Sequence, residues 1–138
     1  MTTDFLVLGS GVAGLRAAIS LARKGSVLIV NKGNPPQSAS AVAQGGIAVA
    51  MASEDSIEAH REDTIRAGAG LCRRGAVETL VEEGPLRVQE LIDWGARFDQ
   101  TGDGYLYARE GGHRTARILR AQGDSSGNEI VRTLLQKA

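Results

Sequence analysis

Hydrophobic residues near the N-terminus follow the order of a strand, a helix and a second strand. Residues 5–8 and 26–30 are apolar runs of strand length, and apolar residues recur at helical spacing from Val12 to about Lys24. Gly25 stands where this helix is expected to stop. The pattern predicts a βαβ unit at the start of a parallel α/β sheet.

The middle of the chain predicts a helical insertion after this unit. Ser53 and Asp55 are candidate caps for a helix that runs to about Ala67. A second helical segment spans about residues 76–83, and we expect Gly84-Pro85 to break it and to begin a third helix.

The C-terminal third predicts short extended pieces and one more helix. A turn at Gly102-Asp103-Gly104 separates an extended piece around Phe98 from one around Tyr105. The last helix follows a capping box formed by Ser126 and Glu129. Its apolar face consists of Ile130, Val131, Leu134 and Leu135.

The segment Gly9-Ser10-Gly11-Val12-Ala13-Gly14 joins the first predicted strand to the helix that follows. In a dinucleotide-binding turn, the first glycine permits the tight turn, the second lets the backbone approach a pyrophosphate, and the third lets helix and strand pack closely. Free N–H groups at the helix start face the phosphate charge. This context indicates nucleotide binding, and a plain packing turn is the alternative.

The end of the second strand departs from the usual nicotinamide-binding pattern. An acidic residue about 20 positions after the glycines usually binds the ribose, whereas this chain has Asn31 and Lys32 there. Asn31 can exchange hydrogen bonds with a ribose, and Lys32 either contacts a phosphate or is solvated. Further on, Gly45 and Gly46 indicate close approach of the backbone either to a ligand or to the protein itself.

Composition and charge narrow the class of protein. The 138 residues are 42% hydrophobic, which suits a packed globular domain, and 16 basic and 16 acidic residues leave no net charge. We therefore expect neither nucleic acid nor a membrane as a partner. A single cysteine, Cys72, excludes a disulfide framework and a Cys-rich metal site, and no leader pattern precedes the first strand. These features predict a cytoplasmic protein.

Two parallel strands are too few for a stable nucleotide-binding sheet. Such a sheet needs at least a third strand, and parallel sheets are covered on both faces. We therefore expect residues 1–138 to be the N-terminal part of an incomplete Rossmann-like domain that lacks its remaining sheet and any substrate-capping domain. A naturally short, non-catalytic nucleotide-binding module is the alternative.

Six segments, in order along the chain, resemble the L-aspartate oxidases of the succinate dehydrogenase and fumarate reductase flavoprotein family. They are GSGVAGL (9–15), NKG (31–33), AQGGIA (43–48), EDT (62–64), AGAGLC (67–72) and REGGH (109–113). The resemblance covers nearly the whole chain and implies a Rossmann-like FAD-binding domain.

The resemblance also implies where FAD is held. The glycine turn meets the pyrophosphate, and Asn31 and Lys32 lie near the adenosine. The isoalloxazine is lined by a segment that includes Ala39, Ser40, Ala43, Gln44, Gly45 and Gly46. In the respiratory relatives a histidine attached covalently to FAD stands at the position of Ala39. Alanine has no nucleophilic atom, so we expect noncovalent FAD.

Glu110 is the position at which the resemblance implies substrate selection. A glutamate there orients the substrate in L-aspartate oxidases, and a carboxylate is the natural partner for the ammonium that distinguishes L-aspartate from succinate. From the residues alone, a Glu110 that is solvated or paired with Arg109 is favoured over a Glu110 that binds substrate. The resemblance favours the substrate role instead. His113 either binds a substrate carboxylate or packs.

The implied reaction is the FAD-dependent oxidation of L-aspartate to iminoaspartate in NAD biosynthesis, with oxygen or fumarate as the electron acceptor. A fumarate reductase or succinate dehydrogenase segment is the alternative within the family. The motifs that carry the family's proton-transferring arginine are not matched in this chain. We therefore expect residues 1–138 alone neither to oxidise L-aspartate nor to hold FAD tightly.

Overall fold

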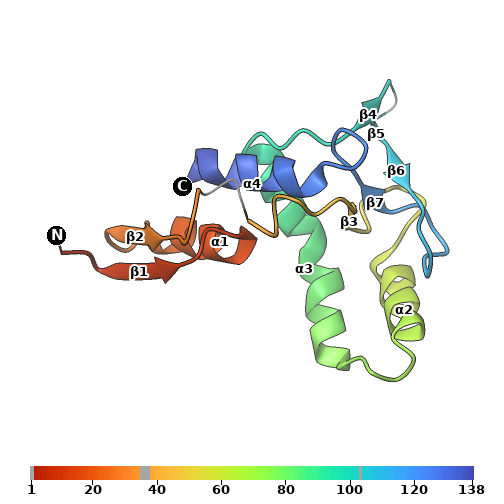
Figure 1. Cartoon of the computed structure of the whole chain (residues 1–138). Helices are drawn as coiled ribbons and strands as arrows, with labels where there is room; N and C mark the ends of the chain where they lie inside the picture. The colour runs from red at the N-terminus through yellow and green to blue at the C-terminus, as the bar shows by residue number, and fades with distance from the viewer. Residues whose placement is uncertain (1, 35–37, 103) are drawn as a thin grey trace.

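A parallel βαβ unit opens the fold, as the sequence predicts. The computed structural model describes residues 2–34, 38–102 and 104–138. Strand β1 (Phe5–Leu8) pairs in parallel with β2 (Val27–Val30), and helix α1 (Val12–Leu21) connects them. Figure 1 shows this unit at the N-terminal end of the chain, in red and orange.

Helix α1 is packed between this sheet and the last helix, α4 (Ser126–Lys137). Leu15 and Ile19 of α1 are buried with Val131 and Leu134 of α4 in one apolar cluster. Figure 1 shows α4, in blue, lying along α1. The apolar spacing of both helices therefore identified the sides that pack.

Apolar side chains on one face of β1 remain exposed. Side chains alternate along a strand, and those of Leu6 and Leu8 are 58% and 76% exposed. Phe5 and Val7 are partly covered.

Among the residues that the structure describes, no helix is both long and apolar enough to cross a membrane.

A three-stranded antiparallel sheet joins distant segments and was not expected from the sequence. Strands β3 (Ile47–Ala48) and β6 (Tyr107–Ala108) both pair with the central strand β7 (Ile118–Leu119). A separate hairpin pairs β4 (Gln100–Thr101) with β5 (Gly104–Tyr105) around the predicted turn, whose Asp103 lies outside the described residues. The apolar core beside the three-stranded sheet includes Val49, Val88, Phe98, Leu119 and Ala121.

Helix α2 (Ile57–Ala67) ends at the predicted residue but has a different cap. The N-cap is Ser56, whose hydroxyl accepts a hydrogen bond from the backbone N–H three residues on at 3.1 Å. The prediction of Ser53 or Asp55 was wrong. Both oxygens of the Asp55 carboxylate accept hydrogen bonds from Arg117, at 2.7 and 2.8 Å, so this carboxylate serves a tertiary contact.

Helix α3 (Arg74–Asp93) is continuous, so the predicted break at Gly84-Pro85 is wrong. A proline inside a helix removes one backbone hydrogen bond and crowds the preceding turn. The helix nevertheless buries residues before and after the proline, namely Val77, Val81 and Val88. Tertiary packing of this side outweighs the local cost of Pro85.

The predicted capping box does not close the N-terminus of α4. Ser125 is the N-cap, and Ser126 is already helical. The Ser126 hydroxyl accepts a hydrogen bond from the Ala121 N–H at 3.1 Å, and the Glu129 carboxylate accepts one from the Arg97 N–H at 2.7 Å. Both side chains thus bind neighbouring segments instead of the start of their own helix.

Candidate functional site

The turn between β1 and α1 has the geometry of a nucleotide-binding loop. Gly9 has a φ of +100°, a conformation that L side chains rarely adopt. A Cβ on Gly14 would lie 2.0 Å from the carbonyl oxygen of Gly9. Glycine at the first position therefore permits the turn, and glycine at the last permits α1 to pack against it.

The N-terminus of α1 leaves polar groups available to an anion. Its N-cap is Gly11, which offers no side-chain cap, and its first turn contains no acidic residue. Ser10 is 2% exposed, and its hydroxyl has no hydrogen-bond partner among the described residues. Helix N-termini bind phosphate through such N–H groups, and an orphaned buried hydroxyl gains a hydrogen bond from the same ligand. The turn therefore fits a pyrophosphate.

Residues 39–46, the segment expected to line the flavin, lie against this turn. The Ser40 hydroxyl accepts a hydrogen bond from the Val12 N–H at 3.3 Å. On the other side, the N–H of Gly127 in the first turn of α4 donates to the carbonyl of Ala43 at 3.0 Å. The segment is thus held by the N-terminal ends of two helices, α1 and α4.

The two adjacent glycines of this segment have different surroundings. A Cβ on Gly45 would have no atom of the described residues within 4 Å. A Cβ on Gly46 would lie 2.2 Å from Cγ2 of Ile118 and 2.5 Å from the carbonyl oxygen of Leu119. Self-packing therefore requires Gly46, whereas Gly45 leaves open space beside the backbone. Ala39 and Gln44 are also exposed in this segment.

At the expected adenosine end, Asn31 and Lys32 are exposed directly after β2. The Asn31 side-chain amide donates to the carbonyl of Gly33 at 2.8 Å. This hydrogen bond fixes the local turn, so the carbonyl oxygen of the Asn31 side chain is the atom left to accept a ribose hydroxyl. The Asn31 side chain thus has a structural role of its own.

Glu110 lies in the loop between β6 and β7, where its carboxylate pairs with Arg120 rather than with the neighbouring Arg109. Arg120 directly follows β7. The pair with Arg109 that was weighed as an alternative does not form, because the antiparallel β6–β7 pairing returns the chain to Glu110 ten residues later. His113 is partly buried, and its Nδ1 lies 3.2 Å from an Arg117 terminal nitrogen. The contact of the His113 ring is thus with the protein.

A buried ion-pair cluster holds the β6–β7 loop against α2. The Arg117 side chain is fully buried and pairs with Asp55 and Asp63, whose carboxylates are also fully buried. Asp63 additionally accepts hydrogen bonds from the Arg114 backbone N–H at 2.9 Å and Nε at 2.6 Å, and from Arg66 at 2.7 Å. We refer to Asp55, Asp63, Arg66, Arg114 and Arg117 as the ion-pair cluster.

Hydrogen bonds keep the buried Asp63 carboxylate charged. Burial by itself raises the pKa of Asp63, but hydrogen bonds from the Arg114 backbone and side chain outweigh it and hold that pKa well below its usual value. His60, buried nearby on α2, has a lowered pKa because of burial and the positive charge of Arg117. Arg114 forms ion pairs with Asp63 and with Glu62. Sequence reasoning included residues 62–64 only as a motif and missed Arg117.

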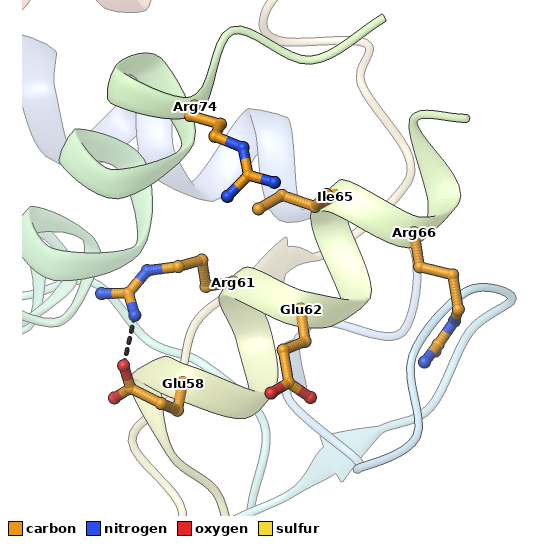
Figure 2. Close-up of a pocket in the computed structure, with 6 residues that line it drawn as sticks. All are labelled: Glu58, Arg61, Glu62, Ile65, Arg66 and Arg74. Carbon is orange, nitrogen blue, oxygen red and sulfur yellow. Dashed lines mark hydrogen bonds and ion pairs between the residues drawn. The ribbon is translucent and has the colours of Figure 1, made fainter. Parts of the chain in front are cut away.

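A hollow of about 440 Å³ on α2 lies apart from the glycine turn. Figure 2 shows Arg61 pairing with Glu58 along the helix, and Arg74 of α3 extending toward Ile65. Glu62 and Arg66 complete its lining. Most of its charged side chains form ion pairs with one another or with the ion-pair cluster. None of the residues predicted to contact the cofactor lines this hollow.

Together, the glycine turn, the orphaned Ser10 hydroxyl and residues 39–46 form the candidate dinucleotide site. The chain belongs to the FAD-binding domain family, whose model matches residues 4–138. FAD is accordingly the cofactor that this membership indicates, and the site described above fits it.

More particular similarity is to one group of flavoenzymes. The chain is 50% identical over 134 residues to the chloroplastic L-aspartate oxidase of Oryza sativa subsp. japonica, covering 96% of this chain and 21% of that relative. Sdh1 of Mycobacterium smegmatis matches with a TM-score of 0.90 and 39% identity, over 99% of this chain and 24% of Sdh1. Quinol fumarate reductase FrdA of E. coli matches with a TM-score of 0.91 and 31% identity, again over 99% and 24%. The chain thus spans about a fifth of the first relative's length and about a quarter of each solved chain.

Proposed function

We propose that the protein containing residues 1–138 oxidises L-aspartate to iminoaspartate with noncovalently bound FAD, as a step toward NAD, and that these residues form the N-terminal part of its FAD-binding domain. The observation that carries the proposal is the position of Glu110. Support comes from the ion pair of this carboxylate with Arg120, because the Arg120 side chain packs against Gly46 of the segment that we expect to line the flavin. The similarity to a named L-aspartate oxidase supports the same substrate.

Each part of the site has a distinct task in this proposal. FAD, when bound, supplies the hydride acceptor of the oxidation. The glycine turn and Ser10 bind its pyrophosphate. The N-termini of α1 and α4 hold residues 39–46, which would line the ring. Glu110 binds the substrate ammonium through a charge-assisted hydrogen bond. Ala39 offers no atom for a covalent flavin link.

The mode of cofactor binding is tested by acid precipitation of the purified protein. Noncovalent FAD is expected to stay in the supernatant, where its absorbance is measured. Flavin retained in the protein pellet would contradict the assignment of Ala39.

The substrate is tested with E110Q, which removes the charge while keeping the shape of the side chain. Loss of one charge-assisted hydrogen bond corresponds to about tenfold or more in kcat/KM. We expect that loss for L-aspartate and no comparable loss for succinate. The control is E78Q, which makes the same change at an exposed position on α3.

The second candidate is a fumarate reductase or succinate dehydrogenase, favoured by the TM-scores of 0.90 and 0.91 to Sdh1 and FrdA. These two classes differ in their need for an ammonium partner. If succinate is oxidised well, L-aspartate is oxidised poorly, and E110Q leaves both rates unchanged, the second candidate is correct.

A further inference from the structure

Arg120 lies where the flavin-lining segment meets the β6–β7 loop. In the antiparallel pairing of β3 with β7, Ile47 faces Leu119, and continuing this register places Gly46 opposite Arg120. The Cγ of Arg120 lies 3.1 Å from the position that a Cβ on Gly46 would take. The aliphatic stem of Arg120 therefore occupies space beside this glycine.

The Arg120 guanidinium has more N–H donors than its hydrogen bond to Glu110 uses. A terminal nitrogen donates to Glu110, whereas Nε is buried and has no partner among the described residues. The two side chains are 40% and 44% exposed, so neither is enclosed by protein. The exposed part of the guanidinium can donate a charge-assisted hydrogen bond to an anionic oxygen that reaches it. Arginine also presents its N–H groups as a planar fork that matches a carboxylate.

We infer that Glu110 and Arg120 together recognise the zwitterionic head of an α-amino acid, with Glu110 binding its ammonium and Arg120 binding its α-carboxylate. This inference rests on the proposed function, in which the substrate is L-aspartate. The neighbouring opposite charges of the pair match those of the head group. Without substrate the two side chains neutralise each other, and binding a zwitterion exchanges partners without changing the net charge of the site.

A purely positioning role for Arg120 makes a different prediction. If Arg120 only holds Glu110 in place, it matters for ligands with an ammonium and not for plain dicarboxylates. If Arg120 binds a carboxylate, it matters for both. Succinate, which has two carboxylates and no ammonium, separates these roles.

The experiment measures dissociation constants of L-aspartate and succinate from the change in flavin absorbance of the FAD-loaded protein. We expect R120M to weaken both ligands by about tenfold or more, because a charge-assisted hydrogen bond is lost in each case. We expect E110Q to weaken L-aspartate alone. The matched control R109M removes an exposed charge next to Glu110 and is expected to change neither constant.

R120K retains the charge without the planar fork and is expected to give intermediate affinities for both ligands. If R120M fails to hold FAD, the dissociation constants of L-aspartate and succinate are measured for R120K instead. Weakening of L-aspartate alone in the arginine variants, or unchanged affinity for both ligands, would overturn the inference. If the unmodified protein holds FAD but binds neither ligand, the proposed function itself is wrong.

Discussion

Replacing Asp63 by asparagine (D63N) removes the anion at the centre of the ion-pair cluster. The fully buried Asp63 carboxylate accepts hydrogen bonds from Arg66, Arg114 and Arg117 at 2.6 to 3.0 Å. Breaking one partner of a buried ion pair costs about 3–5 kcal/mol because the other charge stays buried. Arg117 keeps Asp55, so we expect D63N to lower the free energy of unfolding by about 3 kcal/mol. Urea denaturation of the purified protein measures it.

Glu62 provides the matched control because it also pairs with Arg114 but is 65% exposed. We expect E62Q to cost less than about 1 kcal/mol. The pKa of Asp63 is lowered in the folded protein, so its contribution is complete above its unfolded pKa of about 3.9 and is lost as the pH falls through the lower folded pKa. The stability difference between the unmodified protein and D63N should therefore be constant near neutral pH and shrink below about pH 4. Equal costs for D63N and E62Q would refute the reasoning.

Two further substitutions test the site and the fold. G14A should abolish tight FAD binding in a fluorescence titration, because its Cβ would lie 2.0 Å from the Gly9 carbonyl oxygen. G75A should bind FAD normally in that titration, because its Cβ would meet no atom of the described residues within 4 Å. S56A should lower the free energy of unfolding by about 1 kcal/mol through loss of the α2 N-cap, and an unchanged urea midpoint would count against that cap.

Local patterns predicted the βαβ unit because its signals lie within a few residues of one another. Gly9 and Gly14 mark the turn between a strand and a helix, and the conformation of Gly9 and the packing of Gly14 follow from that local geometry. The apolar faces of α1 and α4 were likewise readable from helical spacing. These elements are specified by neighbours in the sequence.

The remaining features depend on partners far apart in the chain. Arg117 pairs with Asp55 and Asp63, which lie 62 and 54 positions away. The residues next to Arg117 in the sequence therefore do not indicate that it is buried. The predicted caps failed for a related reason, since Asp55 binds Arg117 and Glu129 binds the Arg97 N–H, 62 and 32 positions away. Glu110 was identified by resemblance, but its partner Arg120 became visible only through the pairing of β6 with β7.

Anaerobic reduction of the bound flavin tests the central claim most directly. The FAD-loaded protein that contains residues 1–138 is mixed with L-aspartate or with succinate, and the visible absorbance of the oxidised flavin is followed. The account predicts rapid loss of that absorbance with L-aspartate, much slower loss with succinate, and a slower reaction with L-aspartate in E110Q. Bleaching by succinate with no response to L-aspartate would contradict it.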